Sequence, residues 1–384
     1  MKSPVSNGIL LTLIALVLLA AMSTAHAEDM RGAWVTAWTS GFYTPEEADA
    51  TIAAAKAANL NTLFIQVRKV ADAYYESTIE PRGSEIAPGY DPLAYTIEKA
   101  HAQGVQVHAW VNVFRVWREK EWPANPNHLV NQHRDWLNKT YKGETYASEG
   151  VYLDPGIPEA REYITQVIED IANRYNVDGI HLDYIRYPGN EWGYSSTALL
   201  RYYSETGEKT KPKPTDAKWL DWRRDQVTIL LRQIRTKVTA VKPQAKITAA
   251  TIPWGDCPDS FSNSAPYTKV CQDWRQWLCE GLLDANIPMN YRVESKPKMA
   301  QQFRIWLDGF SRWSGGRPVF VGIDVSTNEP KHVIQQIEAV RKANLQGFVM
   351  FSFNASARRD ALVNALKSSN CSAVAPAKGT NKVL

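Results

Sequence analysis

Cysteine is scarce in this chain of 384 residues. The four cysteines, Cys257, Cys271, Cys279 and Cys371, all lie in the last third of the sequence. None of them forms the close pairs that are typical of zinc sites, so we expect no metal site built on them. In an oxidising compartment four cysteines can form two disulfide bridges, and we expect structural bridges of this kind.

Long hydrophobic runs are also lacking, apart from one at the N-terminus. Lys2 precedes an apolar run from Gly8 to Ala21, which is shorter than the ~20 residues needed to span a bilayer. Ala25, His26 and Ala27 then form an A-x-A cleavage motif. We therefore expect residues 1–27 to be a signal peptide, with a periplasmic or secreted mature protein that has no membrane span after cleavage. Residues 369–384 are rich in small and polar residues, and we expect a disordered tail there.

Clustered charge and several common catalytic motifs are absent as well. The 44 basic and 40 acidic residues are scattered, which argues against a nucleic-acid surface or a basic membrane helix. The chain has no G-x-S-x-G, HExxH or P-loop motif, and no glycine-rich first turn for a dinucleotide. We expect no cofactor and no resident metal. Nothing in the sequence indicates an oligomeric state.

Short apolar runs alternate with amphipathic helical patterns along residues 28–368, which favours a parallel sheet wrapped by helices. The expected strands are Gly32–Trp38, Thr62–Arg68, Val105–Val111, Gly179–Asp183, Lys246–Thr251, Leu283–Asn290, Pro318–Asp324 and Gly347–Phe353. The expected helices are Pro45–Ala58, Pro92–Gln103, Pro158–Tyr175, Asp216–Val241, Ser264–Cys279, Lys296–Trp313, Lys331–Ala343 and Ala357–Lys367. Eight such units predict an α/β fold, a single-domain (β/α)8 TIM barrel. Long loops follow the third, fourth and fifth strands, at Phe114–Ile157, Pro188–Thr215 and Pro253–Asn263.

Polar side chains interrupt the apolar strands near their carboxyl ends, where a barrel of this kind carries its active site. Asp183 ends the fourth strand, a position suited to a catalytic carboxylate. The expected substrate-binding residues are Gln66, Arg68, Asp72, His108, Trp110, Asn112, His181, Tyr184, Arg186, Asn290 and Tyr291. Buried polar groups are costly without partners, so their clustering predicts a ligand site.

Several motifs, in order along the chain, resemble those of the glycosyl hydrolase-like 10 family. They are Arg31–Val35, Gln66–Arg68, Asp72–Ser77, Val107–Asn112, Tyr152–Pro158 and Asp178–Tyr184. The resemblance covers nearly all of the expected mature chain. It implies a (β/α)8 barrel with glycosidase chemistry distantly similar to the α-amylase clan, in bacterial envelope proteins that include a glycosidase acting on peptidoglycan strands without stem peptides.

The same resemblance implies that Asp183 occupies the position of the clan's nucleophile. The clan's pattern G-x-R-x-D reads Gly179-x-His181-x-Asp183 here, with His in place of Arg, which leaves the role of Asp183 open. The chain also departs from the family's usual residues after the fifth and sixth strands, at Ile252–Cys257 and Pro288–Arg292. Substrate contacts on that side are therefore expected to differ.

Glycoside hydrolysis normally needs two carboxyl groups, one to protonate the leaving oxygen and one to attack the sugar or activate water. We expect Asp183 to be the nucleophile or base, kept ionised by Arg68 or Arg186. Asp324 and Asp256 are equal candidates for the acid. A substrate with an N-acetyl group could instead supply its own nucleophile, in which case Asp183 would orient that group or act as the acid. The expected substrate is an envelope or extracellular polysaccharide, with peptidoglycan strands as one candidate.

Two alternatives remain open at this point. A catalytically idle barrel that binds glycans would equally suit the loop tryptophans. A metal-dependent polysaccharide deacetylase would require His108, His181 and Asp183 to converge on one ion.

Overall fold

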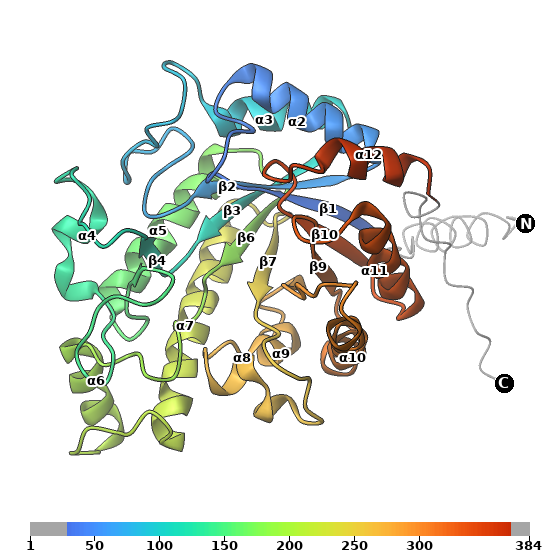
Figure 1. Cartoon of the computed structure of the whole chain (residues 1–384). Coiled ribbons are helices and arrows are strands. Elements are labelled where there is room, and N and C mark those ends of the chain that lie inside the picture. The colour runs from blue at the N-terminus through green and yellow to red at the C-terminus, as the bar shows by residue number, and fades with distance from the viewer. Residues whose placement is uncertain (1–28, 370–384) are drawn as a thin grey trace, which may run out of the picture. The chain divides into compact units, whose positions relative to one another are not determined.

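Eight parallel strands form the centre of the computed structural model, which describes residues 29–369 (Figure 1). The strands are β1 Met30–Val35, β2 Thr62–Arg68, β3 Gln106–Asn112, β6 Gly179–Asp183, β7 Lys246–Thr251, β8 Ala285–Pro288, β9 Phe320–Asp324 and β10 Gly347–Phe351. Their order in the sheet is β8-β7-β6-β3-β2-β1-β10-β9. This order confirms the predicted (β/α)8 barrel.

The barrel closes between β8 and β9 through few backbone contacts. Two isolated parallel bridges join these strands, Asn286 to Val319 and Met289 to Gly322. A Cβ atom at Gly322 would lie 2.8 Å from the carbonyl oxygen of Pro288. The glycine therefore allows the two backbones to approach closely enough to close the barrel.

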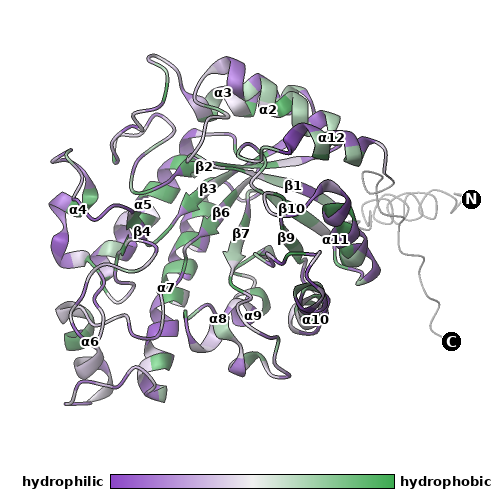
Figure 2. Cartoon of the chain, viewed as in Figure 1, coloured by the Kyte–Doolittle hydropathy of each residue, from purple (hydrophilic) through white to green (hydrophobic). Residues whose placement is uncertain are grey.

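Helices surround the sheet, with their hydrophobic residues directed toward it and hydrophilic residues outside (Figure 2). They are α2 Pro45–Ala57, α3 Pro92–Ala102, α5 Pro158–Arg174, α7 Ala217–Val241, α8 Ala265–Thr268, α9 Trp274–Cys279, α10 Pro297–Trp313, α11 Pro330–Lys342 and α12 Arg359–Lys367. Five begin with proline at the first position, where its missing N–H costs nothing. The single helix expected at Ser264–Cys279 is two short helices, α8 and α9.

The long loops after β3 and β6 contain structure that the sequence pattern did not predict. The first holds a two-stranded antiparallel sheet, β4 Arg115–Trp117 with β5 Val151–Tyr152, and the short helices α4 Leu129–Gln132 and Arg134–Trp136. The second holds helix α6 Ser196–Thr206, on the same side of the barrel as α4 (Figure 1). The backbone N–H groups of Val113 and Phe114, just before β4, donate to the carbonyls of Asp183 and Tyr184, so the loop after β3 is joined to the end of β6.

Aromatic side chains fill the inside of the barrel. Trp34 of β1 lies at the centre of this cluster, within 6.5 Å of the ring centroids of Phe64, Trp110, His181 and Phe351. Trp34 and Phe64 are almost completely buried. The interior is therefore a packed core, and in a barrel of this kind a ligand is expected at the carboxyl ends of the strands.

Three of the four cysteines fall within the described residues, and Cys257, Cys271 and Cys279 are all unbridged. The prediction of two disulfide bridges is therefore wrong, because two bridges would pair at least two of these three with each other. Cys371, the expected signal peptide and nearly all of the expected tail lie outside the described residues. Between residues 29 and 369, no helix combines the length and the apolar character that crossing a bilayer requires.

Candidate active site

Asp183 ends β6 and is held by two hydrogen bonds. Its Oδ1 accepts from the backbone N–H of Tyr184 at 2.7 Å, and its Oδ2 accepts from Nε1 of Trp110 at 3.2 Å. Trp110 lies on the neighbouring strand β3, in register with His181. The carboxylate is fixed in orientation, and 5% of the residue's surface remains exposed.

Burial raises the pKa of Asp183 to about 6, and the bond from Tyr184 and the charge of Arg186 only partly offset this effect. A carboxyl group with such a pKa holds a proton below about pH 6 and is largely ionised at pH 7. The charge of Arg186 favours the ionised form of Asp183, as expected, but burial outweighs it. Strongly perturbed carboxyl groups are typical of catalytic sites.

Tyr184 follows Asp183 with a φ of +51°, in the left-handed region that a tyrosine rarely adopts. This backbone turn lets the N–H of Tyr184 reach back to the carboxylate of Asp183. It also places the tyrosine ring between two guanidinium groups, those of Arg115 at 5.1 Å and Arg186 at 4.9 Å. Strain of this kind is concentrated at functional sites.

Glu149 is a second carboxylate at this site, and the sequence pattern did not indicate it. It lies just before β5, and its two carboxylate oxygens accept from Nη2 of Arg186 at 3.0 and 2.9 Å. The hydroxyl of Tyr152 donates to Oε2 at 2.8 Å. Burial would raise the pKa of Glu149, but the charge of Arg186 and these hydrogen bonds hold it below its ordinary value.

Asp183 and Glu149 are electrostatically coupled, since the charge of Glu149 contributes to the raised pKa of Asp183. Arg186 also acts on both carboxyl groups. The site thus couples one carboxyl group whose pKa is raised to one whose pKa is lowered.

Tyr291, which follows β8, and Asp324, which ends β9, contribute to the site from the opposite side of the barrel. Burial raises the pKa of the Tyr291 hydroxyl well above its ordinary value, and the charges of Asp183 and Asp324 add to the effect. The Tyr291 ring stacks on Phe351 at 5.3 Å. The carboxylate of Asp324 is hydrogen-bonded to the residues that follow it. Its Oδ1 accepts from the backbone N–H and the hydroxyl of Ser326 at 2.8 and 2.6 Å, and its Oδ2 accepts from the hydroxyl of Thr327.

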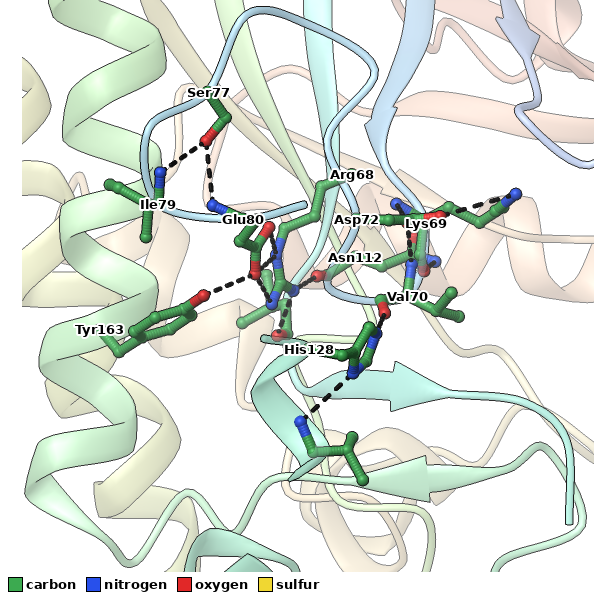
Figure 3. Close-up of polar contacts among 12 residues, drawn as sticks. Arg68, Lys69, Val70, Asp72, Ser77, Ile79, Glu80, Asn112, His128 and Tyr163 are labelled. Carbon is green, nitrogen blue, oxygen red and sulfur yellow. Dashed lines mark hydrogen bonds and ion pairs between the residues drawn. The ribbon is translucent and has the colours of Figure 1, made fainter. Parts of the chain in front are cut away.

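Arg68 does not reach this region, contrary to expectation. Figure 3 shows its guanidinium beside the carboxylate of Glu80, where Nη2 lies 2.7 Å from Oε1 and both side chains are 0% exposed. Tyr163 of α5 also donates to Glu80, at 3.2 Å. The pairing of β2 with β3 shifts in register between Gln66 and Arg68, so simple alternation no longer applies to Arg68.

Asp72 mainly supports the turn after β2. Its Oδ1 accepts from the backbone N–H groups of Lys69 and Val70, at 3.2 and 2.8 Å (Figure 3). Lys69 lies 3.7 Å from its Oδ2, and the Lys69 ammonium also lies over the ring of Trp38. Asp72 therefore positions Lys69 and the loop that carries it.

His108 and His181 point into the barrel as predicted but lie below the site, within its core. Trp34 donates to Nε2 of His181 at 2.9 Å, and Nδ1 of His181 contacts the hydroxyl of Thr248 at 2.9 Å. His108 is 1% exposed, and burial lowers its pKa to about 4. No three His, Cys, Asp or Glu side chains in residues 29–369 gather as metal ligands would. The convergence that a metal-dependent deacetylase requires is therefore not observed.

The three predicted amide side chains also have internal roles. Gln66 and Asn112 are hydrogen-bonded to each other at 3.2 Å, and Asn112 donates to the carbonyl of Lys69 at 2.7 Å. Gln66 accepts from the hydroxyl of Thr36, which ties the loop after β1 to the loop after β2. Asn290 faces outward and donates to the carbonyl of Phe303 on α10 at 3.1 Å. It is Tyr291, its neighbour, that faces the site.

Asp256 lies on the loop after β7, exposed to solvent. Its Oδ1 accepts from Gln302 of α10 at 2.5 Å, so it contacts the helix layer. Trp254 on the same loop turns the other way, and its ring lies 5.4 Å from the guanidinium of Arg186. Of the two expected acids, Asp324 acts together with Asp183 on the pKa of the Tyr291 hydroxyl, whereas Asp256 contacts α10.

The comparisons with known proteins agree with this geometry. Residues 29–316 match the family described as Glycosyl hydrolase-like 10. The chain belongs to this family. Its relatives include Glycosyl hydrolase YngK of Bacillus subtilis (strain 168), 29% identical over 320 residues, which are 76% of this chain and 60% of YngK. Glycosyl hydrolase DigH of Escherichia coli (strain K12) is 30% identical over 257 residues, 60% of this chain and 54% of DigH. This member of the Glycosyl hydrolase-like 10 family thus matches little more than half the length of these relatives.

Solved structures show the same fold at low sequence identity. The PgaB (BpsB) glycoside hydrolase domain from Bordetella bronchiseptica superposes with a TM-score of 0.65 at 14% identity, over 84% of this chain and 94% of that domain. A beta-galactosidase from Marinomonas ef1 gives 0.62 at 11% identity, over 88% of this chain and 58% of the other. At such identities the comparison establishes the barrel fold, which is that of glycoside hydrolases.

Proposed function

We propose that this protein is an exported glycoside hydrolase that cleaves a polysaccharide of the bacterial envelope, with Asp183 as the principal catalytic carboxylate. Peptidoglycan glycan strands are the first candidate substrate, on the basis of the family resemblance. Export, to the periplasm or beyond, is supported by the signal-peptide pattern in residues 1–27.

The pair formed by Asp183 and Glu149 is the observation that carries the proposal. A glycosidase needs one protonated and one ionised carboxyl group beside the scissile bond. Burial raises the pKa of Asp183 to about 6, whereas Arg186 and Tyr152 hold the pKa of Glu149 low. Two carboxyl groups whose environments separate their pKa values are assigned as acid and base in this way.

In this mechanism Asp183 protonates the glycosidic oxygen as the bond breaks. Glu149 remains ionised and acts on the sugar's opposite side, as nucleophile or as the base that activates water. This assignment makes Asp183 the acid, whereas the sequence suggested that it is the nucleophile or base. Trp110 and Tyr184 hold the Asp183 carboxyl group in place, and Arg186 holds Glu149.

The test is turnover of a panel of envelope polysaccharides and of intact or peptide-stripped sacculi, with product masses as the readout. We expect Asp183→Asn to lower turnover by several orders of magnitude and Glu149→Gln by at least ~100-fold. Asp360→Asn makes the same chemical change at a carboxylate that is 92% exposed on α12, and we expect it to be neutral. Full activity of Asp183→Asn would remove Asp183 from the mechanism.

Glu149→Ala in the presence of azide separates the two roles. A small anion can replace a missing nucleophile or base, so we expect azide to restore turnover and to yield a glycosyl azide. In a retaining enzyme azide also rescues Asp183→Ala, because it replaces water in the second step, so the anomer of the product decides the roles. A glycosyl azide of inverted configuration from Asp183→Ala and of retained configuration from Glu149→Ala would reverse the assignment.

A glycan-binding barrel without activity is the second candidate. It is favoured by Trp38 and Trp254, which are 36% and 41% exposed on loops at the carboxyl ends of the strands. Binding of a glycan without any product from the unmodified protein would support this candidate.

A further inference from the structure

Arg115 is an arginine without a carboxylate partner among residues 29–369. It begins β4, and its guanidinium lies between two aromatic rings, 5.3 Å from the centroid of Trp38 and 5.1 Å from that of Tyr184. Only 7% of its surface is exposed. Arg68 and Arg186 are as deeply buried, but each of them is paired with a glutamate.

The hydrogen bonds of Arg115 leave one nitrogen available. Nε donates to the backbone carbonyl of Glu149 at 2.6 Å, and Nη1 to the hydroxyl of Tyr184 at 3.4 Å. Nη2 makes no hydrogen bond to any described residue, and it is not among the polar atoms that are closed off from solvent. The carboxylate of Glu149 is hydrogen-bonded to Arg186 instead, although the charge of Arg115 also helps to lower the pKa of Glu149.

A buried guanidinium is stabilised best by an anion to which it is hydrogen-bonded. Stacking on aromatic rings and the nearby charge of Glu149 only partly offset its loss of hydration. The site is therefore preorganised for a negative group that approaches from the solvent side. A guanidinium N–H binds carboxylates and phosphates alike, and of these two anions the carboxylate is the one that can be built into the sugar unit itself.

Arg115 lies next to the proposed catalytic pair. The hydroxyl that it contacts belongs to Tyr184, whose own N–H binds the Asp183 carboxylate. The backbone N–H of Val113, two residues before Arg115, donates to the carbonyl of Asp183 at 2.7 Å. A group bound at Nη2 is thus close to the sugar on which Asp183 would act.

We propose that Arg115 is a specificity-determining residue that binds a carboxylate carried by the substrate sugar, while the exposed ring of Trp38 stacks against the sugar face. This inference rests on the proposed function and narrows the substrate to acidic glycans. Two sources share this chemistry, the ring carboxylate of a uronic acid and the lactyl ether carboxylate of N-acetylmuramic acid in strands without stem peptides.

Binding is measured by titration calorimetry with the Asp183→Asn protein, so that no ligand is consumed. The ligands are soluble peptide-stripped glycan strands, the same strands with their carboxylates converted to neutral methylamides, and a hexuronate oligosaccharide of similar length. Arg115→Gln and Arg115→Lys are compared with Arg312→Gln. Arg312 lies in the last turn of α10, where it pairs with Asp308, and its replacement changes the net charge equally.

We expect Arg115→Gln to weaken binding of an acidic glycan at least tenfold and to leave binding of the methylamide strands unchanged. Arg115→Lys should retain part of the affinity, and Arg312→Gln all of it. The acidic ligand that binds more tightly identifies the source of the carboxylate. Equal losses on acidic and neutral strands, or no loss on either acid, overturn the inference, provided that the variants show the melting temperature of the parent.

The outcome is separable from that of the proposed function. An Arg115-dependent preference for acidic strands in a protein that cleaves none of them would support the subsite and reject the hydrolase. Cleavage of a glycan without such a preference would support the hydrolase and reject the Arg115 subsite.

Discussion

The indole nitrogen of Trp110 donates to Oδ2 of Asp183 across the neighbouring strands β3 and β6, at 3.2 Å. A hydrogen bond to the ionised form of a carboxyl group lowers its pKa. This bond therefore limits how far burial raises the pKa of Asp183. It links the position of a core aromatic residue to the protonation state of the proposed acid.

Trp110→Phe tests this link. The ring is kept and the donor is lost, so the pKa of Asp183 should rise above about 6. If Asp183 is the acid, kcat/KM falls as pH rises through that pKa, and the variant's alkaline limb should move to higher pH. The measurement is a pH profile on a verified substrate. An unchanged limb, or a move to lower pH, would contradict the assignment.

Asp183→Asn should make the folded protein more stable at neutral pH. Because the folded-state pKa of Asp183 is raised, its ionisation opposes folding, and this cost develops as pH rises from about 4 to above 6. An amide avoids the cost, so we expect a gain on the order of 2–3 kcal/mol at pH 7 and almost none at pH 4. Urea unfolding at the two pH values measures it. Equal stability of both proteins at pH 7 would contradict the buried, perturbed carboxyl group.

Glu80→Gln should destabilise the protein without affecting chemistry. The substitution leaves the Arg68 guanidinium buried with no compensating charge, which typically costs about 3–5 kcal/mol. Glu98→Gln removes a pair on the surface, with side chains 39% and 72% exposed, and should cost less than ~1 kcal/mol. A large loss of kcat in folded Glu80→Gln protein would indicate that Arg68 does contribute to catalysis.

Thiol titration of a Cys371→Ser protein, prepared without reductant, tests the cysteines. Cys279 is exposed and should react at once, whereas Cys271 is 0% exposed and should react only after unfolding. Burial raises the pKa of the Cys257 thiol to about 11, so little thiolate is present and its reaction should be slow. We expect three thiols after denaturation. A count of one would mean that a disulfide had formed.

The barrel can be predicted from the sequence because the strands and helices each carry their own hydrophobic pattern. Gly179–Asp183 and Lys246–Thr251 begin and end where they were predicted. Asp183 was found for the same reason, as a carboxylate that ends a buried strand. The alternation of side chains along a strand also predicts correctly that His108 and His181 point into the barrel. It does not indicate how far along the barrel axis a side chain lies, and both histidines lie within the core.

The remaining site residues depend on features that no local pattern encodes. Arg68 was misplaced because a register shift after Gln66 reverses its direction. Glu149 was missed because it lies in a long loop and reaches Arg186 only through the pairing of β4 with β5. Such a contact follows from tertiary structure, and a glutamate in an irregular segment gives no periodic signal.

Few backbone contacts join β8 and β9, so we expect these two strands to separate first when the protein unfolds. Tyr291 follows β8 and Asp324 ends β9, so separation of these strands would move both side chains away from Asp183 while the rest of the barrel stays intact. On gradual heating, the protein should lose its capacity to hold a glycan some degrees before its helices melt. Amide hydrogens of β9 should likewise exchange sooner than those of β2 and β3, which are bordered by strands on both sides.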